Sequence, residues 1–261
     1  MKDTSLIVCF IINIIICFGI PIGALTYFIV TKKKVVKSFF IGMGVFLFFQ
    51  VFTRIPIIQL VLPKMAWYNV MSISNPILYG LFLGITAGIF EEVGRFLGFK
   101  IGLKNNRSWI DGIAFGFGHG GIEAMVLTGT SSISNLVILI GMNNGTFDAS
   151  KLGMSEESLR ALFNSTGSMI ILLGGIERIF AITIQIALTL LVLYGIRKRK
   201  LIYLGMAILM HTIIDSPVII FPKVFGMGML GLEVFVGISA IVAMIFIIKS
   251  KGLFNKLEEE I

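Results

Sequence analysis

Seven long apolar stretches run along this chain, separated by polar or glycine-rich segments. Each holds about the 20 apolar residues that a helix needs to cross a bilayer. They cover residues 5–30, 38–62, 75–97, 109–128, 168–195, 201–222 and 227–248. An eighth apolar run, residues 131–142, is too short to cross comfortably, and we interpret it as a broken extension of the fourth stretch or as a re-entrant segment. The pattern predicts an all-α fold, a polytopic transmembrane helix bundle of about seven spans, with residues 1–261 forming a single integral membrane domain.

The composition excludes a soluble protein of this size. Hydrophobic residues make up 56% of the 261 residues, and the mean hydropathy is +0.97. A soluble domain cannot hide this much apolar surface from water. Cys9 and Cys17 both fall in the first stretch and form no CxxC pair, so neither a disulfide framework nor a cysteine zinc site is indicated. The first stretch is longer than a signal-peptide core, and we interpret it as a retained anchor.

The positive charge of the chain indicates membrane topology. The net charge is +8, and 14 of the 22 Lys and Arg residues fall in four segments, residues 32–37, 100–107, 197–200 and 249–256. With seven crossings, all four segments lie on one side of the membrane, as the positive-inside rule expects for the cytoplasmic side. We therefore predict a multi-pass protein of the plasma membrane, with its N-terminus outside and its C-terminus inside. Its partners would include the lipid bilayer and no nucleic acid.

Ionisable side chains inside the apolar stretches are the most informative residues. Each costs a few kcal/mol on insertion scales, and such groups usually face a bundle interior or a wet cavity. At about 1.5 Å rise per residue, His119 and His211 lie roughly 15 Å from the cytoplasmic ends of their spans, and Glu91 and Glu92 lie roughly 8–12 Å from the same surface. These groups can therefore share one site. The full set is Arg54, Glu91, Glu92, Arg95, His119, Glu123, Glu177, Arg178, His211, Asp215 and Glu233.

Several of these side chains also share a face of their predicted helix. At about 100° per residue, Glu91 and Arg95 lie on the same face of the third span as the glycines at positions 80, 84 and 88. His119 and Glu123 share a face of the fourth span with the glycines at positions 112, 116 and 120. Small residues at four-residue spacing allow close helix contacts in membranes. We therefore expect the two glycine faces to press the third and fourth spans together.

Histidines and carboxylates at one site support two routes to peptide hydrolysis. In the first, they bind a metal ion that lowers the pKa of a bound water, and a glutamate is the general base. In the second, Glu and His position and activate the water directly. His211 and Asp215, four residues apart on one helix face, add a second imidazole and acid. The chain contains no GxSxG and no HExxH, which excludes serine-elbow and standard zincin enzymes.

Other polar residues have simpler explanations. Arg54 is expected to reach the outer surface beside Pro56. Asp111 is expected to begin a helix in a capping box with Ser108, and Ser155 to cap a short surface helix. The candidate site residues can also serve packing alone, as ion pairs or hydrogen-bonded pairs between helices.

Three motifs on successive predicted helices resemble a known superfamily. They are "EEVGR" (91–95), "FGFGH" (115–119) and "HTIID" (211–215). The set is similar to the EExxxR, FxxxH and HxxxN/D signatures of the CAAX prenyl protease and bacteriocin-processing superfamily of intramembrane peptidases. The continuation "GHGGIE" and the later "GGIER" (174–178) more specifically resemble the YhfC family, described as intramembrane metalloproteases. The motif-bearing core covers about residues 75–222.

The resemblance implies a set of site residues. The implied catalytic residues are Glu91, Glu92, Arg95, His119, His211 and Asp215, and the candidate metal ligands are His119, Glu123, His211 and Glu177. Arg95 is one residue closer to the glutamates than in EExxxR, so the choice between Glu91 and Glu92 as the base stays open. One divalent metal ion such as zinc would complete the site, and a metal-free site of Glu and His is the alternative.

These features favour an intramembrane peptidase that cuts a membrane-embedded or membrane-proximal peptide or protein substrate. A proton-coupled transporter is the first alternative, because acid and histidine chains also form proton relays. Inverted repeats or paired broken helices would mark a transporter, and the sequence has only one interruption, near residues 128–131. A non-catalytic scaffold for a membrane protein partner is the second alternative, because a fold does not fix a function.

Overall fold

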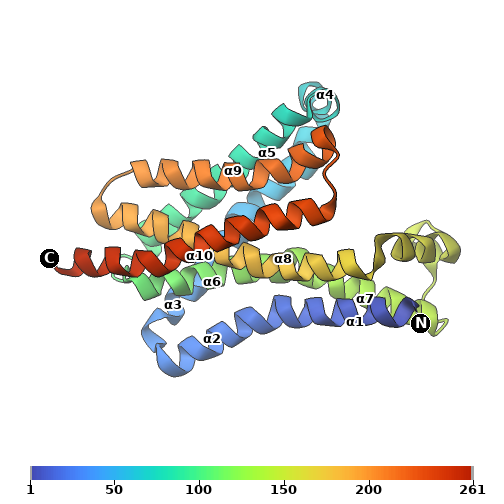
Figure 1. The fold of residues 1–261 in the computed structure, drawn as a ribbon, viewed down its shortest axis with the longest axis horizontal. Helices are drawn as coiled ribbons and strands as arrows, with labels where there is room; N and C mark the ends of the chain where they lie inside the picture. The colour runs from blue at the N-terminus through green and yellow to red at the C-terminus, as the bar shows by residue number, and fades with distance from the viewer. Residues whose placement is uncertain (1, 260–261) are drawn as a thin grey trace.

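The computed structural model describes residues 2–259, and within that range the chain forms helices and no strand. Seven helical segments are long and apolar enough to cross a membrane, which confirms the predicted all-α bundle of seven spans. They are Thr4–Thr31, Lys33–Lys64, Pro76–Gly102, Trp109–Asn143, Glu156–Lys198, Ile202–Phe225 and Met229–Glu259. The connections after the first, third and fifth spans lie at the end of the molecule where the last helix also ends (Figure 1). The four basic segments therefore gather at one end, as the positive-inside pattern requires.

Several spans combine α-helix with short π-helical or 3-10 segments. The elements are α1 (Lys2–Ile14), η1 (Ile15–Gly19), α2 (Ile20–Thr31), η2 (Lys33–Val35), α3 (Val36–Phe46), η3 (Leu47–Arg54), η4 (Ile57–Val61), η5 (Leu62–Lys64), α4 (Ala66–Ser74), α5 (Pro76–Leu97), η6 (Gly98–Gly102), α6 (Trp109–Ala124), η7 (Met125–Gly129), α7 (Thr130–Asn143), η8 (Ala149–Leu152), α8 (Glu156–Lys198), α9 (Ile202–Phe225) and α10 (Met229–Glu259).

Residues 131–142 belong to the fourth span. These residues form α7, which continues α6 through the π-helical segment η7, so the run extends the fourth span and is not re-entrant. Ser108 and Asp111 form the predicted capping box at the start of α6. Ser155 caps α8 by accepting a hydrogen bond from the backbone N–H of Ser158, as predicted. Gly167, with a positive φ of 74°, kinks α8 between its short first part and the spanning part.

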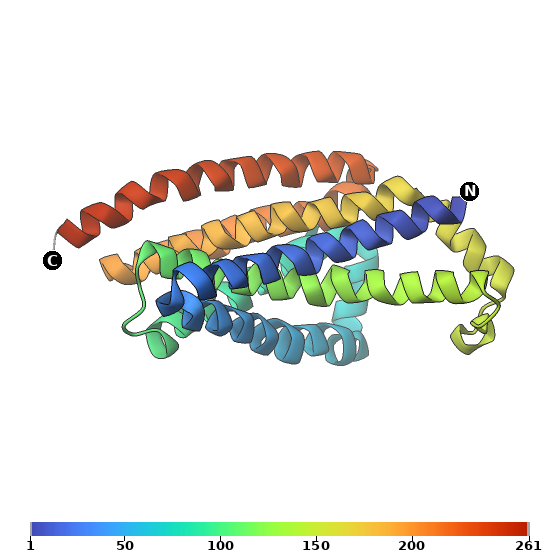
Figure 2. The same cartoon turned by 90° about the horizontal axis from the view of Figure 1, so that it is seen from below.

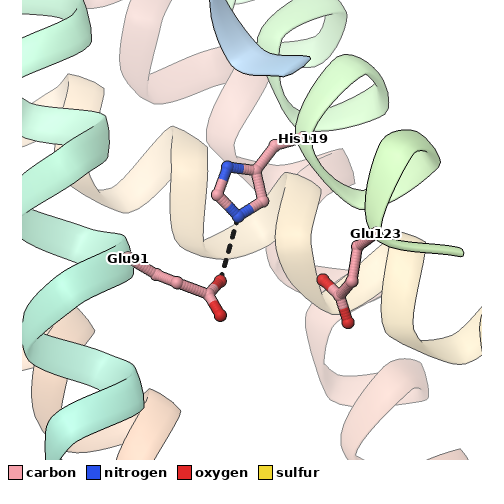
Figure 3. A group of neighbouring side chains, drawn as sticks. All are labelled: Glu91, His119 and Glu123. Atoms are coloured by element: carbon pink, nitrogen blue, oxygen red, sulfur yellow. Dashed lines mark hydrogen bonds and ion pairs between the residues drawn. The ribbon is translucent and has the colours of Figure 1, made fainter. Parts of the chain in front are cut away.

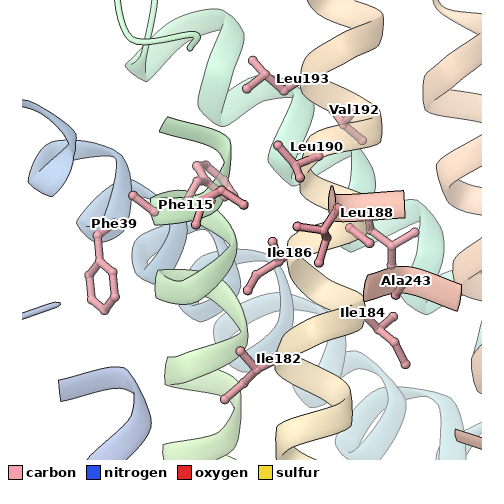
Figure 4. Close-up of a cluster of buried hydrophobic side chains, with 14 of the residues drawn as sticks. Phe39, Phe115, Ile182, Ile184, Ile186, Leu188, Leu190, Val192, Leu193 and Ala243 are labelled. Carbon is pink, nitrogen blue, oxygen red and sulfur yellow. The ribbon is translucent and has the colours of Figure 1, made fainter. Parts of the chain in front are cut away.

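Helix α8 is the centre of the bundle. Its residues from Ile182 to Leu193 supply much of the buried apolar core, where they meet Phe115 of α6, Phe39 of α3 and Ala243 of α10 (Figure 4). α10 lies along one side of the bundle beside α8, and α1 follows α8 on another side (Figure 2). A polar side chain on the buried face of α8 is therefore held among several other spans.

The glycine faces make different contacts from those expected. A Cβ at Gly84 of α5 would lie 2.2 Å from Ser216 Oγ of α9, whereas one at Gly116 of α6 would lie 2.6 Å from the Cα of Ile186 on α8. The prediction that these faces press α5 and α6 together is therefore wrong. The glycines instead bring α5 against α9 and α6 against α8. Gly118, on another side of α6, gives a close contact with α3, since its Cβ would meet the carbonyl oxygen of Phe39 at 1.9 Å.

Candidate functional site

Glu91, on α5, is the hub of a buried polar cluster. Its Oε2 lies 2.9 Å from Nε2 of His119 on α6 and accepts hydrogen bonds from Arg95 Nη2 and Gln185 Nε2, both at 3.1 Å. Its Oε1 accepts a hydrogen bond of 2.5 Å from Nε2 of Gln50. Glu91 is 5% exposed, and His119 and Arg95 are fully buried. One carboxylate thus contacts side chains from four spans.

A group suited to a metal ion is built around this hub. Glu91, His119 and Glu123 each offer one ligand atom, and the three atoms lie within 4.8 Å of one another. His119 and Glu123 are four residues apart on α6, so both side chains project from one helix face towards Glu91 on α5 (Figure 3). One nitrogen and two oxygen donors form a set that zinc accepts.

The other histidine completes the cluster from α9. Nδ1 of His211 lies 2.7 Å from Oε1 of Glu92, and its Nε2 lies 3.3 Å from Asp215 Oδ2 and 3.8 Å from Glu91 Oε1. Arg95 bonds to Glu92 as well as to Glu91, which ties both glutamates to one guanidinium. Asp215 is the most accessible member, with its side chain 43% exposed.

The remaining polar residues of the sequence set lie at the edge of this cluster or outside it. Glu177 pairs with its neighbour Arg178. Arg178 also reaches Glu123 at 3.3 Å, so Glu177 is linked to the cluster through Arg178 and is not in the three-residue metal group. Glu233, on α10, is buried, and its Oε2 has no hydrogen-bond partner among the residues that the structure describes.

Two cavities adjoin the cluster. The larger, of about 330 Å³, is bounded mainly by apolar residues of α5, α8 and α9, with Glu123, His211 and Asp215 among its lining. The smaller, of about 140 Å³, is lined by Gln50, Glu91 and neighbouring residues. Arg54, Glu123, Leu127 and Asp215 line both cavities. A molecule that occupied both would therefore contact Glu91 in the smaller cavity.

Two contributors, Gln50 and Gln185, were not foreseen from the sequence. Gln185 donates from Nε2 to Oε2 of Glu91 and, at 2.6 Å, to Oε2 of Glu123, while its Oε1 accepts from Arg95. Gln50 and Gln185 are primary amides within apolar spans, and this signal could have singled them out. The prediction for Arg54 is wrong: its guanidinium turns inward to α5, where it bonds to the carbonyl oxygen of Leu83 at 2.7 Å.

The fold and the site together define the class. The chain is a multi-pass integral membrane protein with a buried cluster of carboxylates and histidines between its spans. The chain belongs to the YhfC intramembrane metalloprotease family, which matches residues 16–248. It is 35% identical over 246 residues to the "Uncharacterized membrane protein YhfC" of Bacillus subtilis (strain 168), covering 92% of this chain and 94% of that protein. No solved structure matches the chain. The matched range contains every residue of the cluster.

Proposed function

We propose that the protein is an intramembrane peptidase, which hydrolyses a peptide bond in a membrane-embedded or membrane-proximal substrate. The observation that carries this proposal is the meeting of Glu91, His119 and Glu123 beside two adjoining cavities, inside a bundle of membrane spans. Hydrolysis needs a water molecule held next to a base and a place for the peptide beside it. The cluster offers the first, and the cavities offer the second.

A divalent metal ion such as zinc fits the cluster. Glu91, His119 and Glu123 would hold the ion, and three protein ligands leave a position open for water, as in catalytic zinc sites. When bound, the ion would lower the pKa of that water and polarise the peptide carbonyl. The charges also fit, because five carboxyl groups in and around the cluster outnumber three guanidinium groups, which leaves two negative charges if all five are ionised and both histidines are neutral. These groups are Glu91, Glu92, Glu123, Glu177 and Asp215, against Arg54, Arg95 and Arg178.

The other steps of the reaction are assigned to side chains of the cluster. Among the described residues, Oε2 of Glu91 has three partners, whereas Oε1 bonds only to Gln50 and faces Nε2 of His211 at 3.8 Å. Oε1 is therefore the oxygen to which we assign uptake of the proton from water. His211 faces the same oxygen and is oriented by Glu92 and Asp215, which suits it to return the proton to the leaving amine. Arg95 holds the two glutamates in place.

Peptide cleavage by the reconstituted protein tests the proposal. The probe is a library of internally quenched apolar peptides with randomised central positions, incubated with the protein in phosphatidylcholine vesicles. The wild-type protein should cleave some members, and Glu91→Gln or His119→Ala should lower the rate at least about 100-fold, the lower range for a general acid or base. Glu157→Gln, the same change on the exposed first turn of α8, should cleave like wild type.

Thermal unfolding of each purified variant shows whether the loss of activity is a loss of folding. A wild-type protein that cleaves no peptide in the library contradicts the proposal. So do Glu91→Gln and His119→Ala variants that both keep the wild-type rate.

A further inference from the structure

Arg54 is a charged side chain inside a membrane span whose partners are all neutral. Its Nε donates to Thr86 Oγ1 at 3.2 Å, its Nη1 to Gln50 Oε1 at 3.2 Å and its Nη2 to the carbonyl oxygen of Leu83 at 2.7 Å. Within residues 4–259 no carboxylate forms an ion pair with it. A guanidinium has five N–H groups, so two remain beyond these three bonds. A charged group at this depth is costly, and its usual role is functional.

The position of Arg54 is fixed by the local helix. It is the last residue of η3, a π-helical segment, and π-helical turns are frequent at functional sites. Gln50 comes from the same segment and links Arg54 to the hub, because its Oε1 accepts from Arg54 while its Nε2 donates to Glu91. The guanidinium is therefore held one amide group away from the candidate base.

Arg54 also lies where the two cavities meet. It lines both the cavity of about 330 Å³ and the cavity of about 140 Å³. A peptide lying across this junction would enter the smaller cavity, which both Glu91 and Arg54 line, so a carbonyl group can lie between them. That arrangement needs successive contacts of about 3 Å, from base to water, water to carbonyl carbon, and carbonyl oxygen to donor.

The amide and imidazole donors near the junction already have partners. The side-chain amides of Gln50 and Gln185 donate to carboxylates of the cluster. Nε2 of His211 faces Asp215 at 3.3 Å. Asp215, at the HxxxN/D position, has no N–H and is an acceptor when ionised. Among the described residues, Nε of Arg95 and Nε of Arg178 also have no hydrogen-bond partner. Arg54 differs from both because it lines the two cavities where they meet.

We propose that Arg54 donates hydrogen bonds to the carbonyl oxygen of the scissile peptide and stabilises the oxyanion that forms there. This inference rests on the proposed peptidase function. The oxygen of the water molecule bonds to the carbonyl carbon, its proton passes to Glu91, and the carbonyl π electrons move onto the oxygen facing Arg54. When the C–N bond breaks, those electrons re-form the C=O bond and the proton goes to the departing amine.

Steady-state kinetics on the best-cleaved peptide of the library test this role. Two neutral replacements, Arg54→Met and Arg54→Gln, should lower kcat about 100-fold or more and change KM less than about threefold, as loss of an oxyanion donor does. Gln can still donate to Leu83, so it offers a second variant if Met impairs folding. Added guanidinium ion should restore part of kcat in Arg54→Ala. Arg160→Met, which removes an arginine that pairs with Glu156 on the first turns of α8, is the matched control and should keep the wild-type kcat.

The following results would overturn the inference. If the folded Arg54 variants keep kcat within threefold of wild type while Glu91→Gln is inactive, the peptidase proposal stands and the role of Arg54 is wrong. A rise in KM with unchanged kcat, which a binding site for a substrate carboxylate would give, also refutes it. If neither Glu91→Gln nor His119→Ala affects cleavage, the peptidase proposal itself fails and the role of Arg54 fails with it.

Discussion

Gln185 provides a sharp test of the proposed metal centre, because it touches two candidate ligands without being one. Replacing it with Leu removes the Nε2 donor from Glu91 at 3.1 Å and from Glu123 at 2.6 Å. The residue is buried, at 6% exposed. Removing a partner that orients metal ligands typically costs 10–100-fold in metal affinity, which is about 1.4–2.7 kcal/mol. We therefore expect the Kd for zinc to rise 10–100-fold in Gln185→Leu.

The assay is a competition titration of the metal-free protein in detergent, with zinc and a chromophoric chelator. Thr189→Val is the matched control: Thr189 lies one turn further along α8 and is also buried, and among the described residues its hydroxyl bonds only to the backbone oxygen of Gln185. Its Kd should stay within twofold of wild type. The reasoning is refuted if Gln185→Leu binds zinc with wild-type affinity, or if wild type binds no zinc more tightly than Glu91→Ala does.

Two predictions concern the packing that positions the site. Gly118→Ala should destabilise the protein by about 2 kcal/mol or more, because its Cβ would lie 1.9 Å from the backbone oxygen of Phe39. Gly174→Ala is the control and should be neutral or stabilising, because its Cβ would have nothing within 4 Å. Equal shifts of the thermal unfolding midpoint in the two variants would contradict the contact between α3 and α6. Asp111→Ala should lower the stability of the folded protein by about 1–2 kcal/mol. It removes the acceptor of the Ser108 N–H at 3.1 Å and of a buried serine hydroxyl of α3. An unchanged unfolding midpoint would show that this cap is unimportant.

The sequence predicted which residues lie at the same depth, and the structure brings them together. His119 and Glu91 are 28 positions apart, yet their rise along oppositely directed spans placed them at similar heights, and their side chains meet at 2.9 Å. His211, predicted at the same depth as His119, contacts Glu92 at 2.7 Å. Helix rise is a nearly constant quantity, so depth could be worked out without knowing which spans are neighbours.

The neighbours themselves could not be predicted in the same way. A glycine face shows where a helix is approached closely, but it does not say by which helix. Gly84 and Gly116 were assigned to each other, and each packs against a different span. Gln50 and Gln185 stand out less in the sequence for another reason: they carry no charge, and a buried amide costs less than a buried ionised group. Arg54 was assigned to the surface because a long side chain can reach it, and the acceptors that α5 offers were not visible in the sequence.

The spacing of the charged residues suggests how spans that carry so many charged groups can enter the membrane. The bonds to Gln185 and between α5 and α9 join residues up to 119 positions apart, so they cannot form before the bundle assembles. Three of the charged spans, α5, α8 and α9, however, carry pairs of their own, three or four residues apart or adjacent. Arg95 lies beside Glu91 and Glu92 on α5, and His211 lies beside Asp215 on α9. These local pairs lower the cost of each helix in lipid, and assembly then reorganises them into one shared site.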